Sequence, residues 1–159
     1  SYLASLAPDR NFLGIEASRR SARFAASLAA KSGPENLRIL RADFKLLAPL
    51  LVPNSWERVY LHFPDPPHKR GDQKRTIFTQ EFLDAMAKTL VSRGEISVAS
   101  DKPDFFMKML ELAEGDGRFV KAHEGRYLEG LERPVKSRFQ RFWESKGVIP
   151  LVFVVCKLA

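Results

Sequence analysis

A carboxylate framed by prolines is the side chain of this sequence best placed to do chemistry. Asp65 lies in the segment Pro-Asp-Pro-Pro (residues 64–67), which directly follows the apolar run of residues 59–63. That run is typical of a buried parallel strand. Prolines at three of four positions neither continue a strand nor start a regular helix, so the backbone must be stiff and turned. The pattern predicts a carboxylate fixed just beyond the carboxyl end of a strand, where open α/β sheets bind their ligands.

Basic side chains follow this turn. They are His68, Lys69, Arg70, Lys74 and Arg75, and Asp72 is the acid among them. A rigid carboxylate beside a cationic segment suggests chemistry on a polyanion. The alternative is a surface turn followed by a solvated run of charges, which is a common arrangement. We expect His68 to hydrogen-bond to a phosphate or to the backbone rather than to catalyse.

Three further acids, Glu16, Asp43 and Asp101, each end a candidate strand and precede a candidate helix. In a Rossmann-type sheet the acid that closes the second strand accepts hydrogen bonds from a nucleotide ribose, and Glu16 lies where that strand is expected. Asp43 is placed to meet an adenine edge. The alternative is that Asp43 and Asp101 only cap helices, a contribution of about 1 kcal/mol each. No group of His, Cys or acidic residues has metal-ligand spacing, so we expect no metal site.

Strands and helices are expected to alternate along the chain, which indicates a doubly wound α/β fold. The expected strands are residues 11–16, 37–42, 59–63, 95–100, 118–123 and 148–158, and the expected helices are residues 18–31, 44–51, 79–90 and 102–113. Ser18, Thr79 and Asp101 are the predicted N-caps of three of these helices. We expect the 159 residues to form a single domain.

The composition narrows the class of partner. The chain has 26 Lys and Arg against 19 Asp and Glu, a formal charge of +7, which favours an anionic partner, nucleic acid before membrane. No apolar run approaches the roughly 20 residues that span a bilayer, and no signal peptide is visible. The single cysteine, Cys156, is expected to be a packed thiol, and this usage fits a reducing, cytoplasmic setting.

Five segments in this order resemble the tRNA (guanine-N7-)-methyltransferase family. They are GIE (residues 14–16), RADF (41–44), VYLHFPDPPHKRGDQKR (59–75), SVASD (97–101) and RPVKSRFQRF (133–142). The resemblance covers nearly the whole chain, and the proline-framed aspartate with its basic run is the most specific part. It implies a class I methyltransferase fold, mostly parallel with an antiparallel C-terminal strand. It also implies S-adenosylmethionine as cofactor and N7 of a guanine in the tRNA variable loop as the methyl acceptor.

The resemblance also implies roles for individual residues. Glu16 and Asp43 would contact the cofactor, and Asp65 would lie between cofactor and substrate as the catalytic residue. The substrate contacts would be Lys69, Asp101, Ser137, Arg138, Phe139 and Gln140, while Arg70, Lys74, Arg75 and Arg141 would bind RNA phosphates. Pro67 stands where the family has tryptophan, and Ser137 and Gln140 stand where it has threonine and glutamate. Since an amide donates as well as accepts, Gln140 changes what that position offers to a guanine.

The strand and glycine-rich turn that hold the methionine end of the cofactor are not found in these residues. We therefore expect the native protein to have about 40 or more further N-terminal residues, because a Rossmann-type site needs that strand and turn. Without the turn, this chain alone would be inactive. A non-catalytic RNA-binding module derived from a methyltransferase is the main alternative. An NAD-type oxidoreductase is a third reading, supported only by Glu16. The sequence does not decide whether the protein forms a homodimer or needs a partner subunit.

Overall fold

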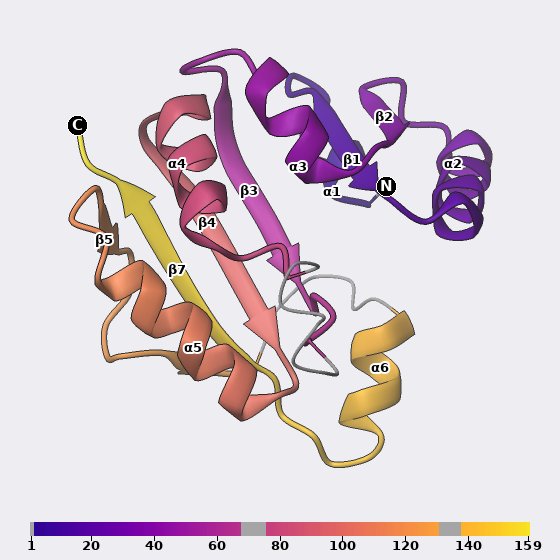
Figure 1. Ribbon diagram of the computed structural model, residues 1–159. Helices are drawn as coiled ribbons and strands as arrows, with labels where there is room; N and C mark the ends of the chain where they lie inside the picture. The colour runs from indigo at the N-terminus through magenta and orange to yellow at the C-terminus, as the bar shows by residue number, and fades with distance from the viewer. Residues whose placement is uncertain (1, 68–75, 131–137) are drawn as a thin grey trace. The chain divides into compact units, whose positions relative to one another are not determined.

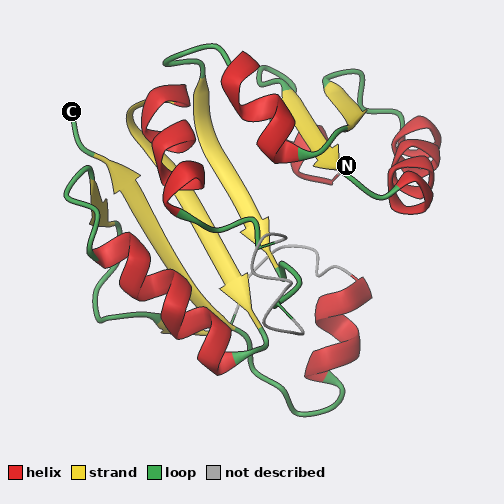
Figure 2. Cartoon of the chain, in the orientation of Figure 1, coloured by secondary structure: helices red, strands yellow, loops and turns green. Residues whose placement is uncertain are grey.

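Two compact units make up the chain, Ser1–Leu50 and Leu51–Ala159. The computed structural model describes residues 2–67, 76–130 and 138–159 (Figure 1). Helices and strands alternate through most of both units (Figure 2), as the sequence pattern predicts. No helix among the described residues is long and apolar enough to cross a membrane.

The first unit contains one pair of parallel strands. Its elements are α1 (Tyr2–Leu6), β1 (Phe12–Glu16), α2 (Arg19–Ser32), β2 (Leu37–Arg41), α3 (Phe44–Leu47) and the 3-10 turn η1 (Ala48–Leu50). The two strands pair in register from Phe12 opposite Leu37 to Glu16 opposite Arg41. Both strand predictions are confirmed to within one residue. The expected helix over residues 44–51 is shorter, because its second half tightens into the 3-10 turn.

Helix α2 begins and ends at residues suited to those positions. The Ser18 hydroxyl accepts a hydrogen bond from the Ser21 N–H at 3.4 Å, which confirms the predicted N-cap. At the other end Gly33 has a φ of 78° and donates its N–H to the Ala29 carbonyl. A side chain at this left-handed position would be strained, so glycine ends the helix at low cost.

The second unit contains a five-stranded sheet. Its elements are β3 (Trp56–His62), α4 (Gln80–Thr89), β4 (Leu90–Ser100), α5 (Pro103–Glu114), β5 (Phe119–Lys121), β6 (Leu128–Glu129), α6 (Arg138–Glu144) and β7 (Leu151–Lys157). The strand order is β3-β4-β7-β5, and β6 also pairs with β7. Strands β3 and β4 are parallel, whereas β7 is antiparallel to β4 and β5. The antiparallel C-terminal strand is therefore confirmed.

Strand β4 begins earlier than the sequence indicates. We expected helix 79–90 followed by a strand from residue 95, but α4 ends at Thr89 and the strand starts at Leu90. Leu90 is fully buried and pairs with Trp56, while Arg58 already pairs with Glu95, so residues between them bulge from the ladder. Arg93 in this bulge has a φ of 61°. The extension depends on pairing with β3, which local periodicity does not report.

The core of the second unit lies between this sheet and helices α4 and α5. Its largest fully buried side chains include Leu83, Met86, Phe106, Met109, Leu110, Ile96, Val98, Phe153 and Val155. The Phe153 ring contacts Phe78 and Phe106, with ring centroids 6.0 and 5.4 Å apart. Adjacent residues Val98 and Ala99 of β4 are both fully buried, so this strand is covered on both faces. A rigid central strand therefore leads to Asp101.

Candidate active site

The carboxyl ends of β3 and β4 lie at the same edge of the second unit's sheet. The strands are parallel, with His62 opposite Ala99 at the end of the ladder. Asp65 follows β3 by three residues, and Asp101 directly follows β4. This is the edge at which open α/β sheets bind ligands. The structure thus brings two of the predicted site acids to one edge.

Phe63 turns the chain out of β3 with strained backbone geometry. Its φ is 56°, a left-handed value that a bulky residue rarely adopts. The turn is held because the Phe63 N–H donates to the Ala99 carbonyl at 2.7 Å and its ring packs against Ala99 and Val152. Residues in such conformations cluster at functional sites, where surrounding structure fixes them. The turn delivers Asp65, whose side chain is exposed, to the solvent side of the strand end.

Asp101 is a buried acid with an unsatisfied oxygen. Its side chain is 7% exposed, and Oδ2 lies 3.2 Å from the Lys102 ammonium. Among the residues that the structure describes, Oδ2 accepts no geometrically sound hydrogen bond. A buried carboxylate oxygen without a donor is costly, so it is the kind of group that a ligand's N–H groups would satisfy.

The predicted role of Asp101 as a helix cap is wrong. Helix α5 begins at Pro103, its N-cap position is Lys102, and no side chain caps it. Proline favours the first helical position and disfavours a helical conformation in the residue before it, which moves the helix start past Asp101. The Ser100 hydroxyl instead accepts the Lys102 N–H at 3.1 Å. The Asp101 carboxylate therefore makes no capping hydrogen bond to α5.

Helix α6 carries the C-terminal part of the predicted substrate block. Gln140 is buried, with 1% exposed, and its Nε2 donates to Glu144 Oε1 of the same helix at 2.9 Å. Arg141 is exposed. Trp143 lies under the Lys102 ammonium, 4.7 Å from nitrogen to ring centroid. Ser137 and the side chains of Arg138 and Phe139 lie outside the described residues, as do Lys69, Arg70, Lys74 and Arg75.

The two acids predicted to bind the cofactor share an edge of the first unit. Glu16 ends β1 and its Oε1 accepts the Ser18 N–H at 2.7 Å. Asp43 follows β2 and its Oδ1 accepts the Lys45 N–H at 2.9 Å as the N-cap of α3. The structure thus confirms that Asp43 caps helix α3. A carboxylate has about four acceptor sites, so one such bond leaves both acids able to accept hydroxyl or amine donors.

Another buried acid of the second unit, Asp116, accepts hydrogen bonds at both of its carboxylate oxygens. It accepts hydrogen bonds from Arg118 Nε at 2.8 Å, from Arg118 Nη2 at 2.6 Å and from Gln80 Nε2 at 2.9 Å. The Arg118 backbone N–H is a further donor at 3.1 Å, and Arg118 also pairs with Asp84. These bonds hold the pKa of Asp116 well below its usual value and raise the pKa of Arg118. The network joins α4 to the turn after α5.

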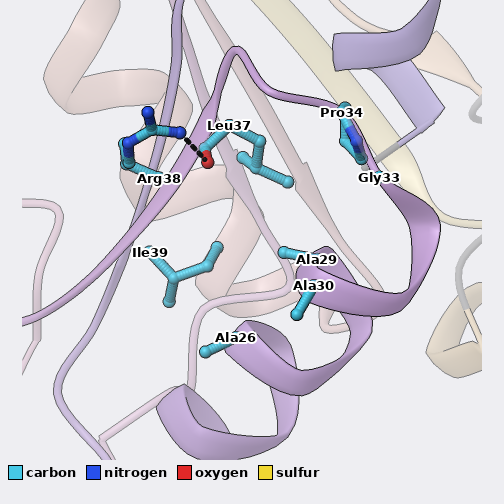
Figure 3. A pocket seen from close by; sticks show the side chains of 8 residues that line it. All are labelled: Ala26, Ala29, Ala30, Gly33, Pro34, Leu37, Arg38 and Ile39. Carbon is cyan, nitrogen blue, oxygen red and sulfur yellow. Dashed lines mark hydrogen bonds between the residues drawn. The ribbon is translucent and has the colours of Figure 1, made fainter.

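A shallow hollow of about 350 Å³ lies in the first unit, between α2 and β2 (Figure 3). Its lining is mostly apolar: Ala26, Ala29, Ala30, Gly33, Pro34, Leu37, Arg38 and Ile39. The Arg38 guanidinium donates to the Leu37 and Glu35 carbonyls. The hollow lies at the amino end of β2, opposite the edge that holds Glu16 and Asp43, and neither acid lines it. No group of three potential metal ligands occurs in residues 2–67, 76–130 and 138–159.

Sequence reasoning missed four residues at the β3–β4 edge. These are Phe63, Ser100, Lys102 and Trp143. Lysine before proline at a strand end is a local signal that could have pointed to Lys102, because proline fixes the conformation of the residue before it. Trp143 gave no such signal, since its contact with Lys102 joins segments far apart in the chain.

Known proteins resemble this chain over most of its length. A family model described as "Putative methyltransferase" matches residues 1–148. A tRNA (guanine-N(7)-)-methyltransferase from Rubrobacter xylanophilus is 42% identical over 146 residues, covering 92% of this chain and 66% of that protein. One from Chloroherpeton thalassium is 34% identical over 155 residues, covering 98% and 69%. The chain therefore spans about two thirds of the length of these relatives.

Solved structures agree on the fold. TrmN from Thermus thermophilus matches with a TM-score of 0.61 at 22% identity, covering 93% of this chain and 36% of that one. An rRNA methylase from Streptococcus thermophilus matches with a TM-score of 0.61 at 14% identity, covering 94% and 74%. The fold is thus the α/β fold of class I methyltransferases, and the sequence matches place this chain in the tRNA (guanine-N7-)-methyltransferase family.

Proposed function

We propose that this protein transfers a methyl group from S-adenosylmethionine to N7 of a guanine in the variable loop of tRNA. The observation that carries the proposal is the pair of acids at the carboxyl edge of β3 and β4. Asp65 is held there by the strained turn at Phe63, and the buried Asp101 has an oxygen that no donor among the described residues satisfies. The activity named for the relatives fits such an edge, because it needs a positioned base rather than a proton acceptor.

Guanine N7 already has a free lone pair, so its attack on a methyl group requires no proton removal. Catalysis then consists of aligning the base, excluding water and stabilising the charge that develops. The ring becomes positively charged when N7 is methylated. Asp65 is proposed to orient the base and stabilise that charge, which an exposed carboxylate on a rigid turn can do without moving.

Asp101 is proposed to recognise the guanine. The Watson–Crick edge of guanine presents the N1–H and N2–H₂ donors, and a base must leave its stack to present them to a protein pocket. The unsatisfied Oδ2 of Asp101 is an acceptor that such donors would complete. Adenine has no donor at N1, so this contact would also contribute specificity.

The cofactor, when bound, supplies an electrophilic methyl group on a sulfonium sulfur. Glu16 and Asp43 are proposed to accept hydrogen bonds from its ribose hydroxyls and its adenine, since each keeps acceptor capacity beyond its bond to a backbone N–H. Asp65 is proposed as a cofactor contact as well as a substrate contact.

The basic residues are proposed to bind the RNA backbone. Lys69, Arg70, Lys74, Arg75 and Arg141 would contact phosphates, and Ser137, Arg138 and Phe139 would contact the substrate near the base. Gln140 is buried, so its proposed contact requires the substrate to displace the residues that cover it. Phosphate contacts supply affinity without sequence information, so shape recognition of the folded tRNA would supply the rest.

The proposal is tested by methyl transfer to tRNA with nucleoside mass spectrometry as the readout. The full-length protein is incubated with S-adenosylmethionine and either bulk tRNA or a transcript that carries 7-deazaguanine in the variable loop. We expect 7-methylguanosine from bulk tRNA and no product in the deaza-substituted loop, which lacks the N7 lone pair. RNA binding without any methylated product would contradict the proposal and favour the non-catalytic RNA-binding module.

A further inference from the structure

Lys102 is fixed at the backbone by its neighbours on both sides. Its N–H donates to the Ser100 hydroxyl at 3.1 Å, and Pro103 occupies the first position of α5. Proline disfavours the helical region for the residue before it, and Lys102 accordingly has φ −114° and ψ 97°. With its backbone held in this way, the direction in which the side chain leaves the turn is set by the sequence Ser-Asp-Lys-Pro.

The Lys102 ammonium joins two groups from different parts of the chain. It lies 3.2 Å from Asp101 Oδ2 and 4.7 Å from the centroid of the Trp143 ring. Trp143 belongs to α6, which begins after the second gap in the described residues (Figure 1). One cation therefore connects the acid at the end of β4 to the helix that carries Arg141.

Each contact alone is weak, because the Lys102 side chain is 49% exposed. Exposed ion pairs contribute little on their own, and a cation over an aromatic ring at an exposed site is also a modest interaction. Their combination on a side chain whose backbone is already fixed costs less ordering entropy than two separate contacts would. The partner acid is buried and, in the part of the chain that the structure describes, has no other donor at Oδ2, so it gains the most from the ammonium.

We propose that Lys102 is a positioning residue that orients the Asp101 carboxylate and anchors α6 beside the carboxyl end of β4. It touches neither guanine nor cofactor; it acts through Asp101 and through Trp143. The consequence for tRNA binding rests on the proposed function, whereas the anchoring of α6 does not. A mobile α6 would leave Arg141 and the preceding substrate block unaligned with Asp101, which weakens binding of the tRNA more than it slows the step that follows.

The test compares Lys102→Met, Lys102→Arg and Trp143→Leu with Lys108→Met. Lys108 is an exposed lysine of α5, so its variant makes the same charge change away from the site. Hydrogen exchange of peptides that cover α6 reports anchoring without any substrate. We expect exchange in α6 to be about ten-fold faster in Lys102→Met and in Trp143→Leu, and unchanged in Lys108→Met, because local opening follows the loss of the anchoring contacts.

Kinetics with tRNA give the second readout. In Lys102→Met we expect KM for tRNA to rise about ten-fold while kcat stays within about three-fold, the pattern of lost binding contacts. Lys102→Arg should restore both readouts, since a guanidinium pairs with carboxylates and stacks on aromatic rings. Melting temperatures confirm that each variant is folded.

The outcomes separate this inference from the proposed function. If the unmodified protein shows no methyl transfer but α6 exchanges faster in Lys102→Met, the proposed function fails and the anchoring stands. If the unmodified protein is active and Lys102→Met changes neither exchange nor KM, the anchoring is wrong and the function stands. If Lys108→Met sped exchange in α6 and raised KM as much as Lys102→Met, the inference would also be overturned. The effect would then come from the change in net charge.

Discussion

Two buried carboxylates of the second unit, Asp101 and Asp116, have opposite surroundings. Their side chains are 7% and 4% exposed, so burial does not distinguish them. Asp116 accepts bonds from the Arg118 guanidinium, the Arg118 backbone and Gln80. Asp101 Oδ2 has the Lys102 ammonium 3.2 Å away and, within the described part of the chain, no hydrogen bond. The difference lies in how many donors each acid has.

The positions of the two acids match this difference. Asp101 follows β4 at the carboxyl edge, whereas α5 runs back along the sheet and brings Asp116 to the opposite edge, before β5. A buried acid with all its donors stabilises the fold, while a buried acid that lacks donors destabilises it. Proteins keep such unfavourable groups mainly where function needs them. We therefore propose that Asp116 serves stability and Asp101 serves ligand binding, and the following experiments test this contrast.

The largest expected effect is on catalysis by Asp101→Asn. We expect kcat/KM for tRNA to fall about 100-fold, which is about 2.7 kcal/mol of transition-state stabilisation. The asparagine amide has only one acceptor oxygen, and its NH₂ group would face the N–H donors of guanine without forming a hydrogen bond. The free energy of unfolding should change little, because the lost ion pair is with a half-exposed lysine, and within the described residues Oδ2 accepts no hydrogen bond. Activity within two-fold of that of the unmodified enzyme would show that Asp101 does not contribute to substrate binding or catalysis.

Asp116→Asn should lower stability and leave activity unchanged, the reverse of Asp101→Asn. We expect the free energy of unfolding to fall by about 1.5 kcal/mol, the low end for hydrogen bonds to a charged group, since Arg118 is half-exposed and stays hydrated without its partner. The rate of methyl transfer per folded molecule should not change. Urea unfolding measures the first quantity and the tRNA assay the second. Glu114→Gln is the matched control, because Glu114 pairs with Arg126 at the surface and its loss should barely move the unfolding midpoint.

Asp65→Asn sharpens the comparison with an exposed acid. We expect turnover to fall at least ten-fold, about 1.4 kcal/mol, while the melting temperature stays the same. The reason is that the strained turn at Phe63 presents this carboxylate without using it for structure. A folded variant with full turnover would show that Asp65 has no catalytic role. A large fall in melting temperature would instead identify it as a turn stabiliser.

Much of the fold follows from local patterns in the sequence. Strands β1 and β2 are set by short apolar runs, and α2 is set by a serine and a glycine at its ends, so these elements were predicted closely. Strand β4 was predicted five residues too short, because its first part pairs with β3 through a bulge that only the tertiary structure fixes. Local periodicity does not contain such long-range pairing.

The candidate site was predictable in its acids but not in their surroundings. A proline-framed aspartate and acids at strand ends are visible as residue types. The left-handed Phe63 turn is not visible, because its strain is balanced by a hydrogen bond to Ala99 on the neighbouring strand. The capping prediction for Asp101 was wrong because one proline at position 103 moved the start of α5. Saturation of Asp116 likewise depends on Gln80, which is distant in the sequence.

The smallest effect is the pH dependence of the stability that Asp116 contributes. Its pKa is lowered in the folded protein, first by the side-chain bond from Arg118, so folding favours the charged carboxylate. The contribution is complete above the pKa of an unfolded aspartate, about 3.9, and is lost as the pH falls below that value. The pKa of Arg118 is raised, so the guanidinium keeps its charge over this range.

The gap in unfolding free energy between the unmodified protein and Asp116→Asn should therefore be constant from pH 7 to about pH 5. Below about pH 4 it should shrink, at no more than about 1.4 kcal/mol per pH unit, the limit for one titrating group. Asp84 also faces Arg118, so Asp84→Asn is measured in parallel to separate its contribution. Urea unfolding at steps of half a pH unit gives the gap. A gap that persists unchanged to pH 3 would show that hydrogen bonding, and not the charge of Asp116, stabilises this end of the sheet, and the contrast with Asp101 would then lose its electrostatic basis.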